Sequence, residues 1–298
     1  LESNIRWLRS NLLADDATIV YRLLRTKGPR PRDCALVYAN NMAKHDFLSE
    51  HVVAPLMSSA PPKELHGQGL LDYFMQEAIS SDSMDTSSSY KELAEAVVRG
   101  TGVVLVDGCG IGLMVDAQGF EKRSVSEPQS ETVVRGPRQG FTEDLGVNVS
   151  LVRRKITSPN LKMKYLYVGE QTRTKTAVMY LESVAKPDLV DEVIQRIEQI
   201  EMDGILESGY IEELIKDSPR SPFPTIGHTE RPDTVAGKIL EGRVAVLVDG
   251  TPFALTMPYL LVEAFQANED YYRHWVLASF HRLVRYISFF LTTSTPGL

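Results

Sequence analysis

The chain carries one stretch of sequence twice: Val97-Val-Arg-Gly-Thr-Gly-Val-Val-Leu-Val-Asp-Gly108 and Ile239-Leu-Glu-Gly-Arg-Val-Ala-Val-Leu-Val-Asp-Gly250. The two copies align without a gap. Asp107 and Asp249 differ by 142 positions (249 minus 107), and Gly100 and Gly242 differ by the same number. Such self-similarity at a fixed spacing indicates a duplicated structural unit.

The same offset relates other parts of the chain. It pairs Ala35-Leu-Val-Tyr38 with Ala177-Val-Met-Tyr180, and the expected helix start at Asp46 with the one at Asp188. Chance can produce one such match, but several matches in one register favour a duplication that covers most of the chain.

Each copy shows the pattern of an α/β unit. Leu161–Val168 alternates apolar and polar residues, which predicts a strand, and a more apolar strand ends at Tyr38 or Tyr180. Leu189, Val193 and Ile197 recur at helical spacing after the second of these. A strand, a helical connection and a further strand predict a right-handed parallel pair, so we expect mixed sheets.

Each copy closes with a predicted hairpin. Asp107-Gly108 and Asp249-Gly250 stand between apolar strands, and Asp-Gly favours tight turns because both residues tolerate positive φ. Gly108-Cys-Gly-Ile-Gly112 is glycine-rich, but it is followed by a strand. A phosphate-binding loop would lead into a helix N-terminus, so we interpret these glycines as turn residues.

The fold class predicted from these patterns is α/β, with two related subdomains of mixed β-sheets flanked by helices and a C-terminal membrane-proximal helix. The expected boundaries are 1–120 for the first subdomain, 121–146 for a charged connector, 147–260 for the second subdomain and 261–298 for a helical tail. Ser80–Ser89 is rich in serine and predicts a flexible loop, whereas Asp217–Pro224 is rich in proline and predicts a stiffer one.

Composition excludes several classes of protein. The 298 residues carry a formal net charge of −7, which argues against a nucleic-acid partner because an acidic surface repels phosphates. Cys34 and Cys109 are the only cysteines, so no disulfide framework is expected and a reducing compartment is favoured. The first residues lack the apolar stretch of a secretory signal, so we expect no export by that route.

Motifs for catalysis and metal binding are missing from the sequence. The six histidines form no H-x-x-x-H pair, the cysteines lack zinc spacing, and no G-x-S-x-G motif occurs. We therefore expect no catalytic residue, metal or cofactor, and no enzyme activity. A site assembled from distant residues stays open, as does a small molecule bound in a cleft between the two copies.

The connector is unusual because it mixes charges with apolar residues and a Gly136-Pro137 bend. The bland interpretation is a solvated linker with weak surface ion pairs. The sequence favours a segment that docks on a surface, its own or a neighbour's, and an anion site is a third possibility. The candidate interaction residues are Lys122, Arg123, Glu127, Glu131, Arg135, Arg138 and Glu143.

The connector resembles the signature of the GerA family of spore germinant receptor A subunits. The second half carries further matching motifs: Asp203–Ile215, Ser221-Pro-Phe-Pro224, Thr229-Glu-Arg-Pro-Asp233, Glu241–Phe253 and Glu269-Asp-Tyr-Tyr272. The resemblance covers essentially the whole chain. The family implies a protein of the inner spore membrane whose hydrophilic region faces the cytoplasm, the spore core. It also implies B and C subunits as partners, assembly into a homo-oligomer, and a role in nutrient-triggered ion release. It attaches no catalytic residue to this region.

The C-terminal tail agrees with that resemblance on physical grounds. It is aromatic and basic, but only a short apolar run follows Arg285, whereas a span needs about 20 residues. Arg282 and Arg285 before a span would keep this side cytoplasmic. We expect a membrane segment after the present C-terminus, and a terminal helix packed on the domain is the alternative.

Overall fold

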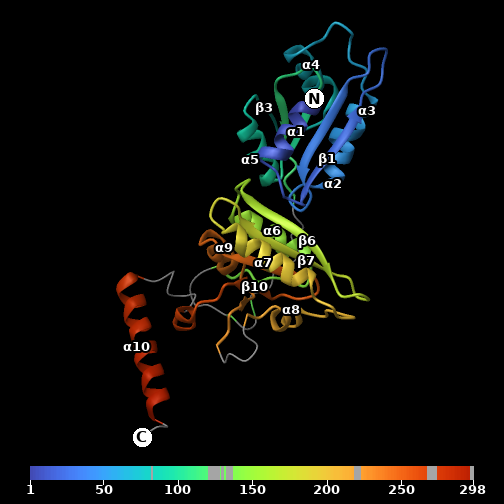
Figure 1. Cartoon of the computed structure of the whole chain (residues 1–298). Helices are drawn as coiled ribbons and strands as arrows, with labels where there is room; N and C mark the ends of the chain where they lie inside the picture. The colour runs from blue at the N-terminus through green and yellow to red at the C-terminus, as the bar shows by residue number, and fades with distance from the viewer. Residues whose placement is uncertain are drawn as a thin grey trace. The chain divides into compact units, whose positions relative to one another are not determined.

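The structure is a computed structural model that describes residues 1–81, 83–119, 128, 131, 137–217, 223–266 and 274–295 (Figure 1). The elements of the first repeat are α1 (Glu2–Asn11), β1 (Ile19–Arg25), β2 (Asp33–Ala39), α2 (His45–Phe47), η1 (Leu48–Val53), α3 (Ala54–Ser58), α4 (Gln68–Tyr73), η2 (Phe74–Ala78), β3 (Met84–Ser87), α5 (Tyr90–Arg99), β4 (Gly102–Val106) and β5 (Gly112–Val115). The elements of the second repeat and the tail are α6 (Leu145–Lys155), β6 (Leu161–Val168), β7 (Thr174–Leu181), α7 (Pro187–Glu198), α8 (Ser208–Leu214), β8 (Gly227–Thr229), α9 (Pro232–Leu240), β9 (Val244–Val248), β10 (Ala254–Met257), η3 (Leu261–Phe265) and α10 (Trp275–Ser294).

The two repeats have the same topology. One five-stranded sheet has the order β1-β2-β4-β5-β3, and the other has the equivalent order β6-β7-β9-β10-β8. The pairing register carries the sequence offset too, because Gly102 is opposite Val115 and Val244 is opposite Met257, each 142 positions further on. The predicted α/β class with an internal duplication is confirmed.

The predicted parallel pair is wrong in the first sheet. β2 and β4 run antiparallel, with Cys34 opposite Val106. The chain between them returns to the end of the sheet that it left, because Gly100 lies against Met42, where an added Cβ would be 2.5 Å from the Met42 carbonyl oxygen. A strand that starts where its neighbour ended must run in the opposite direction.

Helices cover both faces of the first sheet. α1 and α5 bury residues such as Leu8 and Val97 on one face, with Val37 and Val103 of the strands between them. The segments η1–α3 and α4–η2 cover the opposite face around Phe74. Every residue of β4 and of β9 is buried, so these strands are central because both of their faces are covered.

Residues 80–89 differ from the prediction of a flexible loop. They contain β3, which pairs with β5 at the edge of the first sheet, Thr86 opposite Leu113. An edge strand is held by backbone hydrogen bonds, so it can keep polar side chains that hide it from a hydrophobic pattern. β8 is the equivalent strand after Asp217–Pro224, of which residues 218–222 lie outside the described part.

The chain forms two compact units. The first comprises Leu1–Arg123, Val149–Tyr165 and Met179–Ser183, and the second comprises Ser124–Asn148, Leu166–Val178 and Val184–Leu298. α10 belongs to the second unit, and Arg285 in the middle of this helix donates to the Phe265 carbonyl oxygen at 2.8 Å. The boundaries expected from the sequence stay a prediction.

Candidate interaction site at the connector

The candidate interaction residues are only partly described. Lys122, Arg123, Glu127 and Arg135 lie outside the described residues. Glu131 is half-buried, whereas the side chains of Arg138 and Glu143 are exposed. The site is therefore built from Glu131, from residues 137–144 and from the groups that bind them.

Arg231 holds the backbone of the connector at two points. Its side chain is fully buried and forms an ion pair with Asp233, with Nη2 2.7 Å from Oδ2. Nη2 also donates to the Pro137 carbonyl oxygen at 3.0 Å, and Nη1 donates to the Glu131 carbonyl oxygen at 3.4 Å. A planar guanidinium with several fixed donors suits such a junction, so one side chain fixes both ends of the stretch 131–137.

Glu131 adds a side-chain contact to the same turn. Its carboxylate accepts a hydrogen bond of 2.6 Å from the Thr229 hydroxyl. Burial raises the pKa of Glu131, although the Thr229 hydrogen bond and the charge of Arg231 oppose the rise. Nearby, the Phe141 amide donates to the Glu230 carbonyl oxygen at 2.8 Å. The described parts of the connector thus bind the turn between β8 and α9 of the same chain.

Local sequence places Arg231 at this junction. The Thr229 hydroxyl accepts from the Arg231 amide at 3.1 Å, which tightens the turn before α9. Pro232 is the first residue of that helix, where its missing N–H is not needed. A side chain at the residue before the helix is directed by this turn rather than by the helix, so Arg231 can reach the connector.

The Asp-Gly turns lie where the sequence places them, between β4 and β5 and between β9 and β10. Gly108 and Gly250 have φ of +77° and +87°, a conformation that favours glycine. In the second repeat the Asp249 carboxylate accepts from the Leu145 amide at 3.1 Å, and the Gly250 amide donates to the Glu143 carbonyl oxygen at 2.8 Å. This turn therefore fixes the end of the connector and the start of α6.

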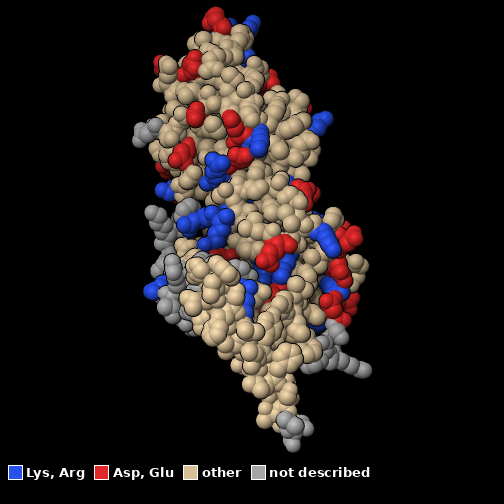
Figure 2. All heavy atoms as spheres, turned by 90° about the vertical axis from the view of Figure 1, so that its left-hand side faces the viewer, with Lys and Arg blue, Asp and Glu red and all other residues tan. Residues whose placement is uncertain are grey.

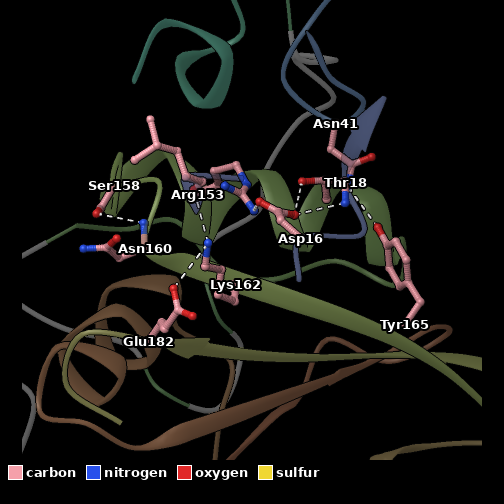
Figure 3. Close-up of polar contacts among 10 residues, drawn as sticks. Asp16, Thr18, Asn41, Arg153, Ser158, Asn160, Lys162, Tyr165 and Glu182 are labelled. Atoms are coloured by element: carbon pink, nitrogen blue, oxygen red, sulfur yellow. Dashed lines mark hydrogen bonds and ion pairs between the residues drawn. The ribbon is translucent and has the colours of Figure 1, made fainter. Parts of the chain in front are cut away.

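Sequence reasoning missed a buried ion pair in the first unit. Arg153 and Asp16 are fully buried, with 2.7 Å between Nη2 and Oδ2 (Figure 3). Asp16 also accepts from the Thr18 hydroxyl at 2.6 Å, and its segment meets β6, where the Ala17 amide donates to the Met163 carbonyl oxygen. No local pattern relates Asp16 to Arg153, because 137 positions separate them.

Lys162 is a second buried cation in that region. Its Nζ donates to the Leu12 carbonyl oxygen at 3.2 Å and lies 3.4 Å from a carboxylate oxygen of Glu182, which is half exposed (Figure 3). Lys162 and exposed Lys164 are two positions apart on β6 and therefore lie on the same face of the strand. The alternation predicted the strand but could not tell which lysine is buried.

Glu263 anchors the segment that leads to α10. Burial would raise its pKa, but hydrogen bonds from Lys238 and Arg243 outweigh burial and lower the pKa of Glu263 below its ordinary value. The Lys238 bond measures 2.6 Å, and the Leu260 amide donates to the same carboxylate. η3 is thus attached to the end of α9 by buried Glu263 and two partly buried cations.

Most of α10 carries exposed apolar side chains. Trp275 is 73% exposed and Phe290 is 66% exposed, and only Ala278 is buried. In Figure 2 the end of this helix forms the tan column at the foot, without acidic or basic side chains. Across the described ranges, which leave out 267–273 and 296–298, no helix has the length and apolar character needed to cross a membrane.

Among the described residues, neither the cysteines nor any group of metal-ligating side chains stands out as reactive. Burial raises the pKa of the Cys34 thiol to about 12, which leaves it protonated and unreactive at neutral pH. In the part of the chain that the structure describes, no three histidine, cysteine or acidic side chains come together as metal ligands.

Comparison with known proteins identifies the family. The family model described as "Bacillus/Clostridium GerA spore germination protein" matches residues 8–298. The chain belongs to this GerA family. The prediction made from the connector and the second repeat is confirmed.

Individual GerA proteins agree with the assignment. Spore germination protein KA of Bacillus subtilis is 38% identical over 89% of this chain and 48% of its own length. Spore germination protein B1 of the same organism is 37% identical over all of this chain and 60% of its own length. The chain thus spans about half the length of the curated relatives that it matches.

A solved structure supports the fold. The crystal structure of the N-terminal domain of the A subunit of the Bacillus megaterium spore germinant receptor GerK3 is similar, with a TM-score of 0.65 and 30% identity. The match covers 88% of this chain and 95% of that one. The GerA chain described here therefore has the fold of a germinant-receptor A-subunit domain.

Proposed function

We propose that this chain is the non-enzymatic, cytoplasm-facing region of a germinant-receptor A subunit, and that it mediates subunit assembly and transmits the nutrient signal. One observation carries the proposal: buried Arg231 binds the carbonyl oxygens of Glu131 and Pro137, so the described part of the connector is held on the chain. Fixed charges at a contact determine register and choice of partner more than affinity. A held segment can pass a small displacement on to a neighbouring subunit.

The expected partners are the B and C subunits and further copies of the A subunit, in the inner spore membrane. The longer relatives and the GerK3 receptor support this setting, as does the name of a relative that is 37% identical, the membrane protein YfkQ of Bacillus subtilis. α10 contains Arg282 and Arg285, exposed apolar residues and no acidic residue. Such a helix suits a place beside the cytoplasmic surface of a membrane.

Charge reversal at the connector tests the proposal. Arg138→Glu and Arg135→Glu in the full-length protein are expected to leave receptor levels and the melting temperature of the chain unchanged and to slow nutrient-triggered germination. Lys91→Glu, at an exposed position on α5, is the matched control and should germinate normally. Normal germination of the Arg138→Glu and Arg135→Glu spores at normal receptor levels would reduce the connector to a linker.

Glu131 must respond differently, because it belongs to the fold. Its carboxylate is bound to Thr229, so Glu131→Lys should lower the melting temperature as well as the germination response. A Glu131→Lys chain with the wild-type melting curve would show that this carboxylate is used only between subunits.

A second candidate function is binding of a small molecule, supported by one pocket in the first unit. The pocket has a volume of about 640 Å³, and Arg9, Tyr21 and Lys164 are among its lining residues. The Tyr21 hydroxyl is buried without a hydrogen-bond partner among the residues described. A thermal-shift screen with amino acids, sugars and nucleotides tests this function, because a ligand of the native state raises the melting temperature. Tyr21→Phe should reduce any shift, and the absence of a shift across the screen would exclude this candidate.

A further inference from the structure

The two repeats differ in the charge of equivalent segments. Residues 187–217, which include α7 and α8, hold ten acidic and two basic side chains. The equivalent residues 45–75 of the first repeat hold four acidic and one basic. Nearly all of the acidic side chains in 187–217 are exposed. The second repeat therefore presents an acidic surface, which we call the α7–α8 face.

The first repeat carries the opposite charge on its β1–β2 hairpin. Residues 22–32 contain five basic side chains and no acidic one, whereas the equivalent residues 164–174 contain two basic and one acidic. Asp33, the first residue of β2, forms an ion pair of 3.3 Å with Arg25, so the hairpin keeps an excess of basic charge. Arg22, Arg25, Lys27 and Arg30 are all exposed. Each repeat thus has a strongly charged surface that its own counterpart lacks, and the two surfaces have opposite sign.

A small apolar pocket lies in the α7–α8 face. Its volume is about 60 Å³, and its lining includes Leu189 and Val193 of α7, Ile215 after α8, and Met257. An engineered cavity of roughly 150 Å³ holds a benzene molecule, so this pocket suits the end of one aliphatic side chain. Arg196 is also in the lining, and it is shared between two carboxylates of the lining.

Those two carboxylates give the pocket a net negative charge. Arg196 lies 2.5 Å from Glu192 and 2.6 Å from Asp217. One cation between two acids leaves one negative charge beside the apolar lining. Leu206 and Leu214, before and on α8, are further exposed apolar side chains of the same unit. The chemistry that fits is an aliphatic side chain with basic neighbours.

The β1–β2 hairpin has such a side chain. Leu23 is 71% exposed and stands between Arg22 and Arg25 on β1, an edge strand. In the second repeat the equivalent position is Tyr165, which is occupied within the chain by a hydrogen bond from Asn41 at 3.3 Å. The equivalent edge of β6 also receives a hydrogen bond from Ala17 to Met163. In the first repeat the equivalent side chain, Leu23, is exposed instead.

We propose that the β1–β2 hairpin of one copy docks on the α7–α8 face of a second copy, with Leu23 in the apolar pocket and its flanking arginines beside Glu192 and Asp217. The proposal deepens the proposed assembly function and rests on it. Opposite charges steer the encounter, and a buried aliphatic anchor fixes the register. Because the two surfaces differ, the contact is head-to-tail and builds a ring or an open chain of subunits.

A charge swap tests the docking with the 298-residue chain. Arg22→Glu/Arg25→Glu makes the hairpin acidic, and Glu192→Arg/Asp217→Arg makes the α7–α8 face basic. Sedimentation at low salt should show self-association of the wild type that weakens as salt rises, and about a tenfold or greater weakening for each variant alone. Mixing the two variants should restore association, because an acidic hairpin then meets a basic face. All four residues are exposed, and the ion pairs that the variants remove, of Arg25 with Asp33 and of Arg196 with Glu192 and Asp217, are surface pairs worth about 0–1 kcal/mol each. Each variant should therefore keep a cooperative melting transition.

Cross-linking in spores tests the same contact in the full-length receptor. A Leu23→Cys/Leu189→Cys protein should give oligomers with a short bismaleimide reagent, and neither single variant should. A wild-type chain that stays monomeric at low salt, together with no cross-link in spores, would overturn the docking. Loss of binding to anionic lipid vesicles by the hairpin variant, without any change in self-association, would assign the hairpin to the membrane instead. Spores of the connector variants report on the proposed function separately, since those variants leave the hairpin and the α7–α8 face unchanged.

Discussion

The turn before α5 and the turn before α9 are the same structure with different uses. In the first repeat the Ser89 amide donates to the Ser87 hydroxyl at 3.0 Å, and in the second the Arg231 amide donates to Thr229 at 3.1 Å. These pairs are related by the 142-residue offset. The Ser87 hydroxyl donates to Glu92 of α5, whereas the Thr229 hydroxyl donates to Glu131 of the connector.

The difference shows how a duplicated unit acquires a role without a new fold. Ser89 accepts from the Glu92 amide and caps its own helix. Arg231 stands at the equivalent position and uses its guanidinium to hold Glu131 and Pro137. A local helix cap in one repeat is thus replaced by a long-range anchor in the other, while the strand and helix around it keep their register.

The largest effect is expected from substitutions in the buried central strand that both repeats share. Leu105→Asp in β4 or Leu247→Asp in β9 places a carboxylate without a partner in a central strand, at a cost of several kcal/mol. Each variant should lose the cooperative melting transition of its unit, measured by circular dichroism. Leu240→Asp, at a position 56% exposed on α9, is the control. A Leu247→Asp chain with an unchanged melting curve would contradict the central place of β9.

The next largest effect is expected when a residue of one repeat is placed at the equivalent position of the other. Asp16 and Ser158 are equivalent turn residues, which accept from the amides of Thr18 and Asn160. Asp16→Ser keeps this turn but leaves buried Arg153 without its carboxylate, which should cost about 3–5 kcal/mol in the free energy of unfolding. Denaturant titration measures the loss.

The matched control for Asp16→Ser is the reverse exchange in the second repeat, Ser158→Asp. It should change the free energy of unfolding by less than about 1 kcal/mol, as is usual for a surface substitution. Equal losses for the two variants would mean that the turn matters and the Arg153 ion pair does not.

Arg231→Met should lower the free energy of unfolding more than Ser89→Ala does at the equivalent position of the first repeat. Removing one partner of a buried ion pair costs about 3–5 kcal/mol, whereas Ser89→Ala removes a helix cap worth about 1 kcal/mol. Unfolding curves of the two variants give the ratio. A loss for Arg231→Met no larger than that for Ser89→Ala would show that Asp233 and the connector carbonyls find other donors.

Sequence was sufficient for everything that depends on local period. The alternation in Leu161–Val168 predicted β6 and the apolar spacing around Val193 predicted α7, because burial imposes these periods on neighbouring residues. The 142-residue offset predicted the duplication because the sequence itself is repeated. The parallel pair failed because direction depends on where a long connection returns. That return is set by the contact of Gly100 with Met42, which no local pattern contains.

The candidate site was only partly predictable for the same reason. Mixed charges and the Gly136-Pro137 bend indicated a docked connector, but the anchor, Arg231, lies 94 positions from Pro137. Arg153 and Asp16 are further apart still. Charged residues that become buried through distant partners look like surface residues in a sequence, so only the fold can identify them.

The smallest expected effect is a difference in pH dependence between Thr229→Val and Ser87→Ala. Each removes one hydroxyl donor to a glutamate and should cost about 1 kcal/mol. Glu131 has a pKa raised above its ordinary value of 4.5 by burial, so the native state binds the proton more tightly than the unfolded state does. Its contribution to the free energy of unfolding is therefore fully present below the unfolded pKa and is lost as pH rises through the raised pKa.

The Thr229 hydrogen bond lowers the pKa of Glu131, and losing this bond should enlarge the decline in stability with rising pH. Free energies of unfolding between about pH 4 and 7 should thus fall more steeply for Thr229→Val than for Ser87→Ala, and Glu131→Gln should remove the decline. Parallel pH profiles for Thr229→Val and Ser87→Ala would mean that Glu131 titrates as a solvent-exposed group, and the connector would then not be held by its side chain.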